Sequence, residues 1–159
     1  MRISVSEDIA APASHVFAQA TDAAAFERQA LRRGAEVRRL DRQAGLGTGA
    51  TWQVRFPYRG RERRLTVAVE RLDPPGHVAA RLEGGGLRGQ STADLVTLGR
   101  GTTRLTLAMD LEATSLGSRI LLQALRLGRG GIERRMGARL KAWARGVELA
   151  WAQRPAGRA

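Results

Sequence analysis

The sequence contains no cysteine, few aromatic residues, only two histidines and a single lysine. Without cysteine, neither a disulfide framework nor thiolate chemistry is available, and a metal site would have to rest on His15, His77 and carboxylates. Because the two histidines lie far apart in the chain, we predict no metal site and no other cofactor. The aromatic content of 4% also leaves few side chains on which nucleic-acid bases could stack.

Long hydrophobic runs are missing as well. No window approaches the roughly 18 apolar residues that indicate a membrane-spanning helix. The N-terminal residues 1–12 alternate between apolar and polar side chains, unlike the continuous apolar core of an export signal. We therefore expect a soluble, cytoplasmic protein. Its 159 residues suit one domain with a substantial core and are too few for two ordinary domains.

Acidic residues are also scarce, with 15 against 27 basic residues and a formal net charge of +12. Such a charge ordinarily favours nucleic acid or an anionic membrane as a partner. However, Lys141 stands beside 26 arginines in a chain rich in alanine and glycine, a combination typical of a GC-rich genome. The arginines are also spread over nearly every segment. A nucleic-acid or ribosome-interacting module is therefore the last of three functional hypotheses, and we do not expect nucleic acid as the partner.

What the sequence has in abundance is alternation of apolar and polar residues. A first half-buried strand is predicted over 3–9, and Pro12 then begins a short helix that ends near residue 20. Asp22 caps a second short helix over 23–31. Six further strands, separated by turns rich in glycine and proline, are predicted at 37–40, 52–58, 65–73, 78–82, 87–98 and 103–111. This order predicts an antiparallel, meandering sheet with one apolar face.

The stretch from Ser115 to Trp151 returns to the 3.6-residue period of a helix, interrupted by glycines within 128–131. In its second half, five apolar residues share one face: Ile132, Met136, Leu140, Trp143 and Val147. Burying each of them contributes roughly 1.5–3 kcal/mol, against about 0–1 kcal/mol for an exposed ion pair. The apolar face therefore decides how this helix packs. Residues 152–159 have nothing to bury and are expected to form a disordered tail.

This order of elements resembles the helix-grip fold of the START-type superfamily, abbreviated SRPBCC. Residues 11–22 resemble its strand-to-helix signature, 101–106 the start of its last strand and 133–140 its terminal helix. The likeness covers residues 3–150 and is nearest to the bacterial polyketide cyclase/dehydrase and lipid-transport group. It implies an α+β fold over 1–151, a single domain whose seven-stranded curved antiparallel sheet wraps the long C-terminal helix, with an apolar cavity between them.

The resemblance also implies a ligand site in that cavity, lined by inward residues of both layers and one charged side chain. The predicted site residues are Trp52, Val54, Phe56, Leu65, Val67, Leu82, Ala93, Leu105, Leu107, Met109, Leu121, Leu125, Met136, Arg139, Leu140 and Trp143. The alternative is an ordinary filled core, against which the shortage of large aromatic side chains favours an open cavity. Arg139 lies on the shoulder of the apolar helix face. It either points at an acidic head group of the ligand or extends its guanidinium into water.

No group of residues predicts a catalytic site. His15 and His77 have no serine, cysteine or paired carboxylate at a spacing that connects them. Several acidic residues of the strands fall opposite the apolar positions: Asp94, Asp110 and Glu112. The inward positions offer few polar groups: Tyr58, Ser91 and Thr103. Whether the protein is an enzyme stays open at this point, and binding is favoured over catalysis.

Two charged or flexible segments complete the sequence. The glycine-rich segment 45–49 does not predict phosphate binding, because a strand and not a helix follows it. The arginines of hairpin 58–64 either contact an anionic membrane or RNA, or are simply solvated.

The leading hypothesis is binding or transfer of a small hydrophobic ligand, a lipid, an isoprenoid or a polyketide-like compound, with at most weak contact with an anionic membrane. A polyketide cyclase or dehydratase is the first alternative. The oligomeric state is not predicted.

Overall fold

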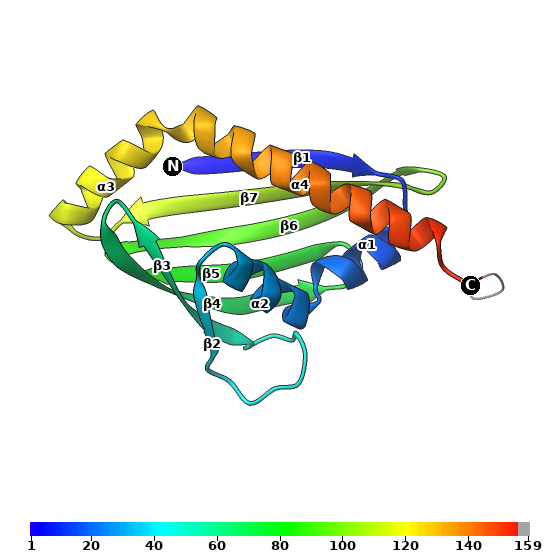
Figure 1. Ribbon diagram of the computed structural model, residues 1–159, viewed down its shortest axis with the longest axis horizontal. Helices are drawn as coiled ribbons and strands as arrows, with labels where there is room; N and C mark the ends of the chain where they lie inside the picture. Colours follow the sequence, from blue (N-terminus) through cyan, green and yellow to red (C-terminus); the bar gives the residue numbers. More distant parts are fainter. Residues whose placement is uncertain (156–159) are drawn as a thin grey trace.

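The computed structural model describes residues 1–155, in which four helices lie on one face of a seven-stranded sheet (Figure 1). The strands are β1 (Arg2–Ile9), β2 (Glu36–Arg39), β3 (Thr51–Tyr58), β4 (Arg61–Asp73), β5 (His77–Gly84), β6 (Leu87–Gly99) and β7 (Thr102–Ala113). Every pairing is antiparallel, and the spatial order is β1-β7-β6-β5-β4-β3-β2. The predicted meander of six strands, with the first strand added beside the last, is confirmed.

Two short helices, α1 (Ala13–Ala20) and α2 (Ala23–Arg32), follow β1 as predicted. The carboxylate of Asp22 accepts a hydrogen bond from the backbone N–H of Ala25 at 3.0 Å, so Asp22 is the N-cap of α2. α1 buries Val16 and Phe17, whereas α2 has no fully buried residue. α1 is therefore part of the core, and α2 is held mainly by contacts at its surface.

The C-terminal helical region is divided at Gly128 into α3 (Leu116–Leu127) and α4 (Arg129–Ala152), which confirms the predicted interruption. A capping box of Ser115 and Ser118 starts α3. α4 runs along β1 at the edge of the sheet and also packs against α1 and α3 (Figure 1). Its fully buried residues are Leu140, Ala144 and Val147.

The buried side chains form three separate clusters. The first joins β1, α1, β6, β7 and α4 through Ile9, Ala11, Val16, Phe17, Leu95, Leu105, Leu140, Ala144 and Val147. The second lies at the β2–β3–β4 edge and contains Ala50, Trp52 and Val69. The third lies beneath α3 and contains Leu82, Leu111 and Leu122. The first two clusters share the half-buried Leu72 and Val78, so the side chains between the fully buried groups are only partly covered.

The outer face of the sheet is covered by ion pairs between neighbouring strands. They include Arg2–Asp110, Arg104–Asp8, Arg88–Glu112 and Arg81–Glu70, with nitrogen–oxygen distances of 2.8–3.2 Å. The acidic residues predicted to face away from the apolar side, Asp94, Asp110 and Glu112, are all exposed here, and Asp94 contacts His77 at 2.6 Å. This face therefore neutralises much of its own arginine charge.

No helix within residues 1–155 is long and apolar enough to span a bilayer. α4 ends at Ala152, one residue into the segment expected to be a tail. The guanidinium of Arg154 then packs 3.5 Å from the centre of the Trp151 ring. Residues 156–159 of the expected tail lie outside the described part of the chain.

Candidate ligand-binding site

The register of the strands brings the predicted sheet residues onto one face. Val67 lies opposite Trp52 on one side and Leu82 on the other, and Leu107 lies opposite Ala93. Directly opposed residues in antiparallel strands point to the same side of a sheet. By the same alternation, the remaining predicted strand residues share this inner face: Val54, Phe56, Leu65, Leu105 and Met109.

The predicted residues differ in how far they are buried. Four of them belong to the three core clusters and are 1–5% exposed: Trp52, Leu82, Leu105 and Leu140. Eleven are half-buried: Val54, Phe56, Leu65, Val67, Ala93, Leu107, Met109, Leu121, Leu125, Met136 and Trp143. Arg139 is exposed. The four buried residues offer a ligand little surface, whereas for the other twelve ligand contact stays a prediction.

The half-buried apolar residues lie around and between the core clusters. Leu107, Ala93 and Trp143 border the first cluster, and Leu65 and Met109 border the third. On a well-packed inner face, such residues would be covered by the opposing layer. The sheet and its helices therefore leave a concave apolar surface only partly closed to solvent.

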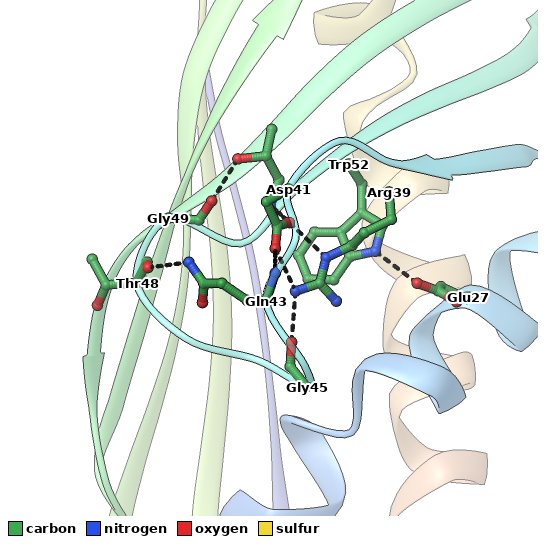
Figure 2. A network of polar contacts seen from close by, with 9 residues as sticks. Glu27, Arg39, Asp41, Gln43, Gly45, Thr48, Gly49 and Trp52 are labelled. Atoms are coloured by element: carbon green, nitrogen blue, oxygen red, sulfur yellow. Dashed lines mark hydrogen bonds and ion pairs between the residues drawn. The ribbon is translucent and has the colours of Figure 1, made fainter.

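Trp52 closes one end of this surface and lies beside a polar network centred on Arg39 and Asp41 (Figure 2). Its indole ring is 2% exposed, and its Nε1–H donates to the Oε1 of Glu27 on α2 at 3.0 Å. Phe26, also on α2, contacts the ring edge-on at a centroid distance of 5.4 Å. The guanidinium of Arg39 lies 4.5 Å from the ring centre. Trp52 therefore fastens α2 to the sheet instead of presenting its polar atom to a ligand.

The same network orders the loop between β2 and β3. The guanidinium of Arg39 donates to both carboxylate oxygens of Asp41, at 2.6 and 3.0 Å, and to the carbonyl oxygen of Gly45 at 2.6 Å. Asp41 also accepts from the backbone N–H groups of Gln43 and Thr51, at 2.8 and 2.7 Å. Together, the Arg39 guanidinium and these backbone donors hold the pKa of Asp41 well below its ordinary value. The loop is thus held in one conformation beside the site.

Sequence reasoning did not find Glu27, Arg39 or Asp41 as a network. The three residues come from a helix, an edge strand and a loop, and no local pattern connects them. The one signal in the sequence was the position of Arg39 two residues after Val37, which places both side chains on the same face of a strand. The structure then sets Arg39 opposite Trp52.

Most of the polar residues considered for catalysis are already engaged. The Thr103 hydroxyl is buried and donates to the Ala11 carbonyl at 2.8 Å. His15 Nε2 lies 3.0 Å from the Val147 carbonyl oxygen, and His77 is on the outer face with Asp94. Tyr58 and Ser91 remain, half-buried and on the inner face. Within residues 1–155, no group of three or more histidines or carboxylates is placed to hold a metal.

Two charged residues whose side chains face inward were not identified from the sequence. Glu7 lies on the same face of β1 as Val5 and Ile9 and is half-buried. Arg63 lies opposite Phe56, so it also faces inward, and its Nε donates to the Tyr58 carbonyl oxygen at 3.4 Å. Alternation alone could have found Glu7, which stands between Val5 and Ile9 on the same face, whereas Arg63 follows Arg61 on its face.

The exposed Arg139 has a second cation near it. Partial burial lowers the pKa of Arg33, which follows α2, and the positive charge of Arg139 lowers it further. The two guanidinium groups, one from α4 and one from the end of α2, are therefore close enough to repel each other. In the described part of the chain, neither forms an ion pair with a carboxylate.

Three comparisons relate the chain to known proteins. The sequence profile of the family described as polyketide cyclase / dehydrase and lipid transport matches residues 1–148. No curated protein sequence gives a significant match.

Among solved structures, the Zhui aromatase/cyclase from Streptomyces sp. R1128 aligns over 100% of this chain and 99% of its own, with 20% identity and a TM-score of 0.70. A START superfamily protein from Mycobacterium smegmatis aligns over 96% and 97%, with 16% identity and a TM-score of 0.60. Norcoclaurine synthase from Thalictrum flavum, solved with dopamine and hydroxybenzaldehyde, aligns over 98% and 88%, with 15% identity and a TM-score of 0.65. At these identities the structural likeness concerns the fold.

Proposed function

The chain belongs to the polyketide cyclase / dehydrase and lipid transport family of the START-type helix-grip superfamily, and from this premise we propose that it binds and transfers a small hydrophobic molecule between its sheet and α4. The observation that carries the proposal is the half-buried apolar inner face between three separate core clusters. Removing apolar surface from water is favourable by roughly 25 cal/mol per Å². Binding of a hydrophobic ligand over this face would therefore be favourable and would stabilise the folded protein.

The lining residues set the chemical class of the ligand. Aliphatic side chains and two methionines, Met109 and Met136, supply an adaptable apolar wall, and Phe56 and Trp143 supply aromatic surface. These features suit a lipid, an isoprenoid or a polyketide-like ring compound. The repulsion between Arg33 and Arg139 is relieved by a carboxylate or phosphate, so the preferred ligand carries an acidic group at that end.

The proposal is tested by identifying what the protein carries. Native mass spectrometry and solvent extraction of protein purified from its own host should reveal a bound hydrophobic compound, and the protein should take up an environment-sensitive dye that this compound displaces. Ala93→Trp, which adds an indole to the inner face of β6, should abolish dye uptake. The matched control is Val96→Trp, on the exposed outer face of the same strand. An interior that takes up no dye, or equal dye uptake by both variants, contradicts the proposal.

The acidic group of the ligand is tested separately. Arg139→Gln should weaken the binding of a fatty acid about tenfold, the loss expected for one charge-assisted contact of about 1.5 kcal/mol, and should leave the binding of the matching fatty alcohol unchanged. Lys141→Gln, also exposed on α4, is the control and should affect neither ligand. Equal weakening of acid and alcohol would show that Arg139 contributes no recognition of charge.

A cyclase or dehydratase activity is the second candidate, because Tyr58 and Ser91 leave polar groups half-buried on the inner face. Two of the structures with a similar fold are also named as enzymes. If this chain is an enzyme, Tyr58→Phe should lower turnover of an aromatic or polyketide substrate without lowering its affinity. Turnover that is unchanged in both Tyr58→Phe and Ser91→Ala would remove the only free polar groups considered for this role.

A further inference from the structure

α3 is apolar on two opposite faces. One face packs on the sheet and contains Leu122, which is buried, and Leu121 and Leu125, which are half-buried. The opposite face carries three large side chains that are almost fully in water: Leu116 is 77% exposed, Ile120 75% and Leu127 91%. Their spacing of four and seven residues places them on one side of the helix. We call this set of three residues the outer α3 face.

Arg119 and Arg126 flank the outer α3 face, and the carboxylate that lines a pocket with them, that of Glu112, is paired with Arg88. α3 contains Arg119 and Arg126 and no aspartate or glutamate. In the described part of the chain, neither arginine forms an ion pair. The outer face of the sheet differs, since its arginines are paired with acidic residues of neighbouring strands. Positive charge is therefore left uncompensated beside the exposed leucines.

The β3–β4 hairpin extends this charge. Its tip lies beside the start of α3 at the left of Figure 1, and residues from both elements line one pocket of about 440 Å³. The pocket is lined by Arg61, Arg63 and Arg64 of the hairpin together with Ser115, Gly117 and Leu121 of the α3 segment. Glu62 of the hairpin forms an ion pair with Arg55, and this pair neutralises the negative charge of Glu62. The hairpin tip therefore lies beside the first turn of α3, on the side of Leu121, and its arginines add positive charge at that end of the helix.

We propose that the outer α3 face, together with the flanking Arg119 and Arg126 and the arginines of the β3–β4 hairpin, docks the protein on a lipid bilayer that contains anionic lipids. Interfacial helices combine these two features, since the apolar side chains enter the acyl boundary while the arginines contact phosphate groups. A second copy of the chain is a poorer occupant, because a two-fold contact would set the same arginines against each other. Nucleic acid would use the arginines but not three exposed aliphatic side chains.

The docking proposal rests on the proposed function, because a membrane contact would serve to deliver or collect the hydrophobic ligand. Leu121 belongs both to the pocket beside the hairpin and to the predicted ligand lining. A bilayer held against α3 therefore lies next to one end of the apolar inner face. A hydrophobic ligand would pass between membrane and interior over a short path, with little apolar surface exposed to water.

The test is flotation of the full chain with lipid vesicles, either pure phosphatidylcholine or a mixture of phosphatidylcholine and phosphatidylglycerol. Binding is expected only to the mixed vesicles and should weaken with added salt. Ile120→Glu and Leu127→Glu should each lower vesicle affinity about tenfold or more, because each removes a large apolar side chain from the contact. Val96→Glu, at a 56% exposed position on the outer face of the sheet, is the matched control and should bind like the unmodified chain.

A second pair of variants separates charge from apolar insertion. Arg126→Ala should weaken binding to the mixed vesicles, whereas Arg100→Ala, at the exposed β6–β7 turn, should not. The proposal is overturned if Ile120→Glu and Leu127→Glu bind the mixed vesicles normally. It is also overturned if those variants convert a dimer to a monomer while the unmodified chain ignores vesicles, because a second copy then covers the face. Dye uptake measured on the same samples reports on the inner face alone, so either proposal can fail without the other.

Discussion

Trp52→Phe tests whether α2 is fastened to the sheet by a single buried indole. α2 buries no residue completely, and Phe26 on it is 42% exposed. Its firmest link is the hydrogen bond from Trp52 Nε1 to Glu27 at 3.0 Å. Phenylalanine keeps most of the ring but has no N–H group to donate. The substitution should therefore loosen α2 while leaving the sheet intact.

The expected cost follows from the contacts of the ring. Losing a hydrogen bond to a charged acceptor costs about 1.5–3 kcal/mol, and the smaller ring leaves a cavity that costs about 1 kcal/mol more. For a domain of this size, such a loss lowers the melting temperature by roughly 5–16 °C. Trp143→Phe is the matched control, because Trp143 is half-buried and makes no side-chain hydrogen bond within residues 1–155. It should lower the melting temperature by only a few degrees, about 1 kcal/mol.

Thermal and urea unfolding of both variants measure this difference. A double-mutant cycle with Glu27→Ala should give a coupling energy of about 1 kcal/mol or more for Trp52 and Glu27. Ligand or dye exchange should also become faster in Glu27→Ala, since α2 covers part of the inner face and opens more readily when its anchor is lost. Equal destabilisation by Trp52→Phe and Trp143→Phe, or no coupling in the cycle, would refute the reasoning.

Three further predictions concern stability. Gly89→Ala should prevent folding or lower the melting temperature severely, because a Cβ at this position would overlap the Asp110 carbonyl oxygen in β7. Thermal unfolding followed by circular dichroism measures the effect, and an unchanged melting temperature would contradict the prediction. The pKa of Asp41 lies below its ordinary value of 3.8, so its contribution is complete above that pH and is lost as the pH falls through the lower folded-state value. Asp41→Asn should therefore lower the melting temperature at pH 7 and have progressively less effect as the pH falls below 3.8. Leu140→Ala should cost about 2–5 kcal/mol and Met136→Ala less, since only Leu140 is fully buried; equal costs in urea unfolding would contradict the assigned packing of α4.

Local sequence patterns predicted most of the fold. The alternation of residues 103–111 and 52–58 placed two strands within one or two residues of β7 and β3. Asp22 and Ser115 marked helix starts, and the glycines after Leu127 marked the division between α3 and α4. These predictions succeed because strand alternation and helix capping depend on residues that are neighbours in the chain.

The predicted ligand lining was harder to divide into core and surface. Trp52, Val54, Leu105 and Leu107 all point to the inner face of the sheet. Trp52 and Leu105 are buried, whereas Val54 and Leu107 are half-buried. The alternation along a strand shows only which face of the sheet a side chain occupies. How much of that face is covered depends on where α1, α3 and α4 cross the sheet, and α4 lies along β1 at the edge instead of over the middle.

The amino-acid sequence by itself determined the order of elements, the apolar face of each one and the excess of positive charge, because all three are properties of neighbouring or summed residues. Only the tertiary structure decided that Glu27 meets Trp52 and that Arg33 approaches Arg139. It also decided that several arginines of the sheet are paired, whereas within residues 1–155 Arg119 and Arg126 of α3 form no ion pair. Those relations join residues far apart in the chain. They arise from the curvature of the sheet and from the positions of the helices upon it, which no local pattern specifies.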